Sequence, residues 1–168
     1  MAPMPTSHPI TDAERELFRH TLATLAYRAR KPLAGAPPDF SSFEAGRTTR
    51  MPGQILSHMC DLFDWALWMA RGEQRWTDTK PAGWEQDCQR FYEALERLDT
   101  YIASAETLGR PVSMLFQGPV ADALTHVGQL NMLRRMFGSP VRGENYARAD
   151  ITAGRAGAVQ PPARVEFD

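Results

Sequence analysis

Four stretches of the chain repeat apolar residues at intervals of three and four, which is the spacing of one face of an α-helix. The first runs from about residue 11 to 30, and Thr11 and Glu14 at its start have the spacing of a capping box. The second opens near Met51-Pro52 and stops at Gly72. The third covers about 84–105 and the fourth about 120–138.

The third stretch has the most regular pattern, a seam of apolar residues at alternating spacings of four and three. Such a seam suits left-handed packing of helices at roughly 20°. It can serve either as the core of a bundle or as a dimer contact. Four amphipathic helices with almost no strand signal predict an all-α fold, a four-helix bundle. The seam residues are Trp84, Cys88, Phe91, Leu95, Leu98 and Ile102.

The connections between these helices are uneven in length. Residues 31–49, a proline- and glycine-rich stretch of nineteen residues, form a long loop after the first helix. A short extended piece is expected at "VSMLF", residues 112–116. We predict a single domain over 1–168, with the bundle at about 11–138 and an irregular C-terminal tail, 139–168, packed on it.

Composition narrows the function classes. Hydrophobic residues at 43% and charged residues at 23% are typical of a soluble globular protein. The net charge of -1 gives no electrostatic reason to expect a nucleic-acid or membrane partner. The N-terminal region lacks the pattern of a signal peptide. Cys60 and Cys88 form no disulfide or metal-binding pattern, so a cytoplasmic protein is expected.

Polar residues interrupt the apolar face of the fourth helix. Asp122 and His126 are four residues apart and therefore about 40° apart around the helix axis, on the side of Leu130 and Leu133. On the second helix, His58 is likewise bracketed by apolar neighbours. Because a buried carboxylate or imidazole needs a partner, these positions call for a chemical explanation.

Two explanations remain open from the residues alone. Asp122, His126 and His58 could converge on one divalent metal ion, with open positions left for water or substrate. Alternatively, Asp122 interacts with the start of its helix and His126 is a core histidine bonded to Gln54 or Gln129.

The segments "ILSHMCDLFDWALWMARGE" and "DALTHVGQLNMLRRMFGSPV" resemble the DinB/YfiT-like superfamily of metalloenzymes. Those proteins are four-helix bundles with one histidine ligand on the second helix and an H-x-x-x-H pair near the start of the last. His58 and His126 match two of the three ligands, and Asp122 stands where the usual pattern has histidine. The resemblance extends from the first helix to Pro140.

The resemblance implies a metal cofactor, with zinc or nickel favoured and iron or manganese as alternatives. It also implies a thiol-dependent transferase, in which a metal-activated thiol or water attacks a small electrophilic substrate and a low-molecular-weight thiol serves as cofactor. A homodimer is the expected assembly. A metal-dependent hydrolase, and a non-enzymatic bundle that binds a ligand or dimerises, are the alternatives.

Several other residues are weaker candidates for a role at the metal site or in substrate binding. Asp61 either accepts a hydrogen bond that orients His58 or lies on a solvated face. Gln129 is a candidate for contact with the metal ligands or the substrate. Asn145, Tyr146 and Arg155 either close over the site as a lid or simply pack. Two further pairs are expected to be structural: Arg134 and Arg135 on the surface, and Trp65 and Trp68 in the core.

Overall fold

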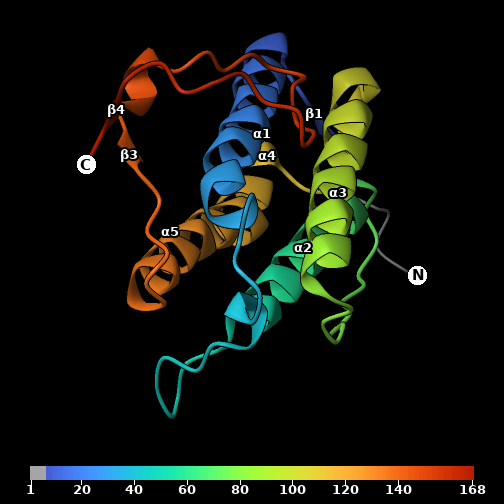
Figure 1. Cartoon of the computed structure of the whole chain (residues 1–168). Coiled ribbons are helices and arrows are strands. Elements are labelled where there is room, and N and C mark those ends of the chain that lie inside the picture. The colour runs from blue at the N-terminus through green and yellow to red at the C-terminus, as the bar shows by residue number, and fades with distance from the viewer. Residues whose placement is uncertain (1–6) are drawn as a thin grey trace.

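The computed structural model describes residues 7–168 and has four long helices packed together (Figure 1). They are α1 (Asp12–Leu33), α2 (Pro52–Ala70), α3 (Trp84–Ser104) and α5 (Ala121–Met136). The predicted all-α fold is therefore confirmed. Among the residues described, no helix has the length and apolarity needed to cross a membrane.

The start of α1 is built as its sequence predicts. The Thr11 hydroxyl accepts the Glu14 N–H at 3.2 Å, and the Thr11 N–H donates to the Glu14 carboxylate at 2.9 Å. The predicted end at Arg30 is wrong, because α1 continues through Pro32 to Leu33. A proline in the last turn removes only one backbone hydrogen bond, so the helix tolerates it there.

The end of α1 also corrects the prediction for Arg134, which is buried and not a surface residue. Its guanidinium donates to the carbonyl oxygens of Pro32, Ala34 and Gly35, at 3.1, 3.3 and 3.4 Å. The last carbonyls of a helix have no partner within it, and Arg134 supplies one from α5. Arg135 is exposed, as expected.

The helices form a four-cornered arrangement in which α1 packs on α3 and α5, and α2 packs on the same two. This places α1 and α2 at opposite corners, so residues 34–51 must cross one end of the bundle. Along the way, Phe40 in a short 3₁₀ turn (Phe40–Ser42) is fully buried against Trp84 and Phe137. The crossing explains the length of this connection and brings it past α5.

Helices α2 and α3 run in the same direction. The Cys60 thiol donates to the Asp87 carbonyl at 3.3 Å, and further along both helices Arg97 pairs with Asp64 at 3.0 Å. Residues 71–83 must therefore run back along α2 before α3 begins. This return segment carries Trp76 and other residues to the middle of α2, where His58 lies.

The apolar seam of α3 lies inside the bundle. Phe91, Leu95, Leu98 and Ile102 are fully buried, while Trp84 and Cys88 are partly buried at its end. The seam is thus part of the bundle's own core. Both cysteines are free thiols, as expected from the sequence.

The short strands occur where no strand was expected. β1 (His8–Pro9) pairs antiparallel with β2 (Thr107–Leu108), and β3 (Gly143–Glu144) pairs antiparallel with β4 (Glu166–Phe167). The prediction of an extended piece at 112–116 is wrong. Residues Val112–Leu115 form the short helix α4, which continues into the turns before α5.

The C-terminal tail covers one side of α1 (Figure 1). Glu144 is buried there, where it accepts the Tyr27 hydroxyl at 2.5 Å and lies 3.2 Å from the Lys31 ammonium. Burial and the Glu144 carboxylate together raise the pKa of Tyr27 to about 12. The tail thus buries a tyrosine that shares a helix face with the exposed His20.

Candidate metal centre

Three metal-ligating side chains come together between α2 and α5. His58 comes from the middle of α2, and Asp122 and His126 come from the first two turns of α5. One nitrogen or oxygen atom from each lies within 4.8 Å of the others. Among residues 7–168, this is the one group of three such side chains close enough to hold a metal ion.

The start of α5 has a local feature that the sequence analysis missed. Residues Phe116–Val120 form a π-helical segment that joins α4 to α5 and contains Pro119. A proline inside a helix lacks the N–H for the usual hydrogen bond, and a wider turn accommodates it. Since a wider turn rotates everything that follows about the helix axis, it sets the direction in which Asp122 and His126 point. The signal that could have revealed it is Gly118-Pro119 within a helical pattern.

The Asp122 carboxylate lies between the two imidazoles. Its Oδ2 is 3.2 Å from Nε2 of His58, and its Oδ1 is 3.4 Å from Nε2 of His126. The two rings are perpendicular, with centroids 5.1 Å apart. Both histidines therefore direct the same ring nitrogen toward one carboxylate.

Gln129 determines which nitrogen of His126 carries the proton. Nδ1 of His126 lies 2.7 Å from Oε1 of Gln129, so the ring donates its Nδ1 proton to the amide oxygen. In neutral imidazole the other nitrogen, Nε2, is then an acceptor. This lone pair faces the Asp122 carboxylate, which is also an acceptor, and a proton or a metal ion between the two atoms satisfies both.

A divalent metal ion fits this donor set. Imidazole and carboxylate ligands lie about 2.0–2.2 Å from zinc, so neighbouring ligand atoms are roughly 3.0–3.5 Å apart at angles of about 90–109°. The two nitrogen–oxygen distances, 3.2 and 3.4 Å, lie in that range. A hydrogen bond to the imidazole's other nitrogen is the usual device for orienting a metal-bound histidine, and Gln129 supplies it.

Asp122 is less deeply buried than the sequence pattern suggests, whereas His126 is buried. The Asp122 side chain is 45% exposed, whereas those of His58 and His126 are 19% and 11% exposed. The expectation that Asp122 points into the apolar interior is therefore wrong. The carboxylate stands at the edge of the bundle, where an ion would be open to water or substrate on one side.

Two hollows flank the centre. One, of about 490 Å³, lies beside His126 and Gln129. The other, of about 340 Å³, lies beside His58 and is bordered by the return segment at residues 78–81. Arg50 borders both. The sequence analysis missed Arg50, for which no local pattern gives a signal.

Trp76 was also missed. Its ring lies edge-on to His58 at 5.7 Å and to Trp65 at the same distance. An isolated tryptophan in the otherwise polar loop after α2 was the available signal. Trp65 is partly buried against the core, whereas Trp68 is only partly buried and is not part of the core cluster, which corrects that prediction.

Asp61 does not orient His58. It is 1% exposed and accepts hydrogen bonds from the N–H and hydroxyl of Thr79, both at 2.7 Å, and from Arg90. Burial opposes ionisation of this carboxyl, but these hydrogen bonds outweigh it and hold its pKa below the usual range. Asp61 is thus neither beside the imidazole nor on a solvated face; it anchors the return segment that carries Trp76.

The residues expected to form a lid lie elsewhere. Asn145 accepts the N–H of Ala147, Tyr146 packs on Tyr27 and Arg28 of α1, and Arg155 bonds to Asp150. None of the three tail residues borders either hollow. The segment that borders the centre is the connection after α1, from which Ala45, Thr48, Thr49 and Arg50 line the larger hollow.

The cysteines offer no further ligand or nucleophile. Cys60 is fully buried, and burial raises the pKa of its thiol; burial also raises the pKa of Cys88 to about 12. Neither thiol is ionised at neutral pH, and the thiolate is the reactive form.

Comparison of the chain with protein-family models, curated proteins and solved structures finds no match.

Proposed function

We propose that the protein is a divalent-metal-dependent enzyme in which His58, Asp122 and His126 hold the ion. One observation carries this proposal: Nε2 of His126 faces the Asp122 carboxylate at 3.4 Å, while Gln129 occupies Nδ1. A metal ion between these two atoms satisfies both, and the Nε2 of His58 at 3.2 Å from the carboxylate completes a three-ligand set.

The reaction that fits best is transfer of a low-molecular-weight thiol to a small electrophilic substrate, as the resemblance to DinB-type enzymes implies. A bound divalent ion lowers the pKa of a coordinated thiol or water and so supplies a nucleophile near neutral pH. Zinc or nickel is the proposed ion, since two imidazoles and one carboxylate suit both. The helical fold and the order of the ligands along the chain support this assignment.

The residues around the three ligands orient the imidazoles and cover part of the metal site. Gln129 holds the His126 ring in the tautomer that presents Nε2 to the ion. Trp76 covers one edge of His58 and limits access of water from that side. The half-exposed side of Asp122 leaves the approach open to the reactants.

Metal analysis tests the proposal. The parent protein, purified without chelator and then dialysed against zinc, is expected to retain about one ion per chain, and His126→Ala to retain little. His20→Ala, an exposed histidine on α1, is the matched control and should bind as the parent does. Equal zinc content in the parent and His126→Ala, at unchanged helicity by circular dichroism, would refute the ligand assignment.

A second measurement separates transfer from hydrolysis, because the half-exposed Asp122 also gives water direct access to the ion. The zinc-loaded protein is incubated with an electrophile such as 1-chloro-2,4-dinitrobenzene, with and without mycothiol or bacillithiol. Thiol adduct formation that is lost in His126→Ala supports the transferase. Product that forms equally fast without thiol supports a metal-dependent hydrolase instead.

A further inference from the structure

The larger hollow beside His126 has a strongly apolar wall. It occupies about 490 Å³ between α5 and the connection after α1. Met132 and Met136 of α5 are more than half exposed there, and Leu133 and Ile55 form the deeper wall. Methionine side chains are flexible and polarisable, so they adapt to apolar groups of different shapes.

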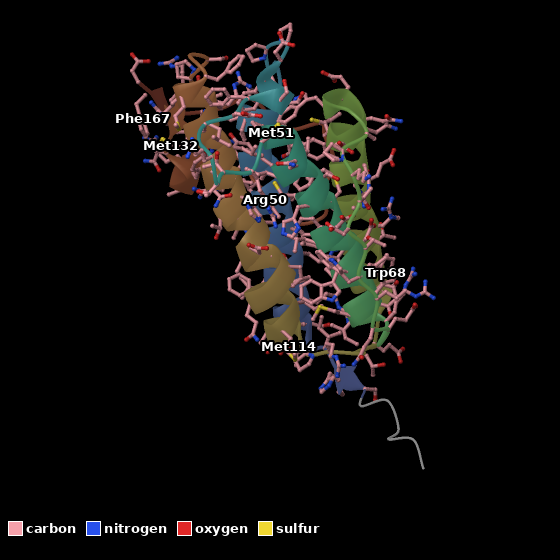
Figure 2. The ribbon with its side chains drawn as sticks, turned by 90° about the horizontal axis from the view of Figure 1, so that it is seen from below. Arg50, Met51, Trp68, Met114, Met132 and Phe167 are labelled. Atoms are coloured by element: carbon pink, nitrogen blue, oxygen red, sulfur yellow. The ribbon has the colours of Figure 1, made fainter. Side chains whose placement is uncertain are left out.

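The same hollow has one formally charged residue on its wall, Arg50. Figure 2 shows Arg50 between the ribbons of α2 and α5, with Met132 on the α5 side. No acidic residue lines this hollow, and no ion pair or hydrogen bond ties the Arg50 side chain to any of residues 7–168. The guanidinium is therefore free to pair with an anion from solution.

The polar edge of the metal centre borders the same hollow. His126 and Gln129 line the hollow together with Arg50 and the methionines. A molecule that fills this hollow therefore comes close to the imidazole that we assign to the ion.

We infer that this hollow binds a small amphipathic carboxylate, with its carboxylate on Arg50 and its apolar group against Met132 and Met136. Planar guanidinium pairs with carboxylate through two parallel hydrogen bonds, which a neutral amide cannot reproduce. The assignment of this molecule as the substrate rests on the proposed metal-dependent function. The binding itself does not, since neither Arg50 nor the methionines are ligands of the ion.

Titration of the metal-free protein tests the predicted contact between Arg50 and the carboxylate. Octanoate and octanamide serve as probes, and intrinsic tryptophan fluorescence or calorimetry measures binding. We expect octanoate to bind at least tenfold more tightly than octanamide, and Arg50→Gln to remove that preference. Arg47→Gln, an exposed arginine of the same connection that does not line the hollow, should change octanoate binding by less than twofold. Equal binding of the two probes, or an equal effect of the two arginine variants, would overturn the inference.

A second pair of variants tests the predicted contact between the apolar group of the ligand and the methionines. Met132→Gln is expected to weaken octanoate binding several-fold, whereas Met114→Gln, an exposed methionine outside this hollow, should leave it unchanged. Acetate, which lacks the apolar group, should bind at least a hundredfold more weakly than octanoate. Octanoate binding that is insensitive to Met132→Gln would contradict the placement of the apolar group.

The two proposals fail separately. Arg50-dependent octanoate binding in a protein that retains no zinc would support the hollow as a carboxylate site and refute the metal-dependent function. Zinc retention that depends on His126, in a protein with no preference for octanoate, would support the metal centre and refute the carboxylate site.

Discussion

Two aspartates on neighbouring helices have opposite environments. Asp61 is buried, and its oxygens accept hydrogen bonds from Thr79, Thr77 and Arg90. Asp122 is half exposed, and it faces Nε2 of both His58 and His126, while Gln129 occupies the other ring nitrogen of His126. A carboxylate whose two oxygens both accept hydrogen bonds stabilises the fold. A carboxylate that faces imidazole nitrogens at the surface is positioned to share a metal ion with them.

The contrast cannot be seen in the spacing of the residues. Asp61 follows His58 by three positions, and Asp122 precedes His126 by four, so each aspartate shares a helix face with a histidine. What distinguishes them is the chain segment that packs over each one. The return segment at residues 71–83 brings donors to Asp61, while the region over Asp122 is open.

The largest expected effect concerns stability at Asp61. Asp61→Ala leaves Arg90 without its buried partner, and breaking such a pair costs about 3–5 kcal/mol of unfolding free energy. Urea unfolding of the metal-free protein measures it. Asp64→Ala, which removes a more exposed partner of the same arginine, is the control and should cost less. Equal losses in the two variants would mean that Asp61 is not the anchor.

Asp122→Ala should have the opposite effect, with a large loss of zinc affinity and little change in unfolding free energy. We expect zinc affinity to fall at least about 100-fold, because second-sphere changes alone already cost 10–100-fold and this change removes a ligand. Unfolding free energy of the metal-free protein should change by no more than about 1 kcal/mol, the value of a carboxylate near a helix start. Competition with a chromophoric chelator measures the affinity.

A substitution that keeps a metal-ligating side chain at position 122 tests whether the loss of zinc in Asp122→Ala is due to the loss of a ligand. Asp122→His replaces the carboxylate by an imidazole, which is also a zinc ligand, and the variant is expected to retain zinc. Loss of zinc in Asp122→His, or full retention in Asp122→Ala, would argue against a ligand at this position.

A smaller effect is expected at Gln129. Gln129→Ala removes the acceptor for Nδ1 of His126, and we expect a loss of about tenfold in zinc affinity without loss of stability. Gln89→Ala on the exposed face of α3 is the matched control. If the two variants bind zinc equally, Gln129 does not orient the ligand.

The smallest effect is a pH dependence at Asp61. Its pKa is lowered in the folded protein, so the unfolded chain takes up the proton first, and the stability that the carboxylate contributes is complete above about pH 4. As the pH falls below that value, this contribution is lost. The difference in unfolding free energy between the parent and Asp61→Asn should therefore narrow from pH 5 toward pH 2. A constant difference across that range would show that Asp61 is not ionised in the folded state.

The sequence by itself determined the four long helices and which of their faces are apolar. The capping box at Thr11 and the seam of α3 depend on residues a few positions apart, and helix geometry relates such positions directly. For the same reason, the sequence indicated that His58 and His126 lie on buried faces. Helix periodicity shows in which direction a side chain points around the axis of its own helix. It does not show which distant segments of the chain pack against that side chain.

Only the tertiary structure decided which polar groups meet. Arg134 is buried because α1 ends beside it, and Tyr27 is buried because the tail, more than a hundred residues away, covers it. The π-helical segment sets where Asp122 points, and the crossing of residues 34–51 brings Arg50 to the centre. These outcomes depend on contacts between segments remote in sequence, whose arrangement no local spacing encodes.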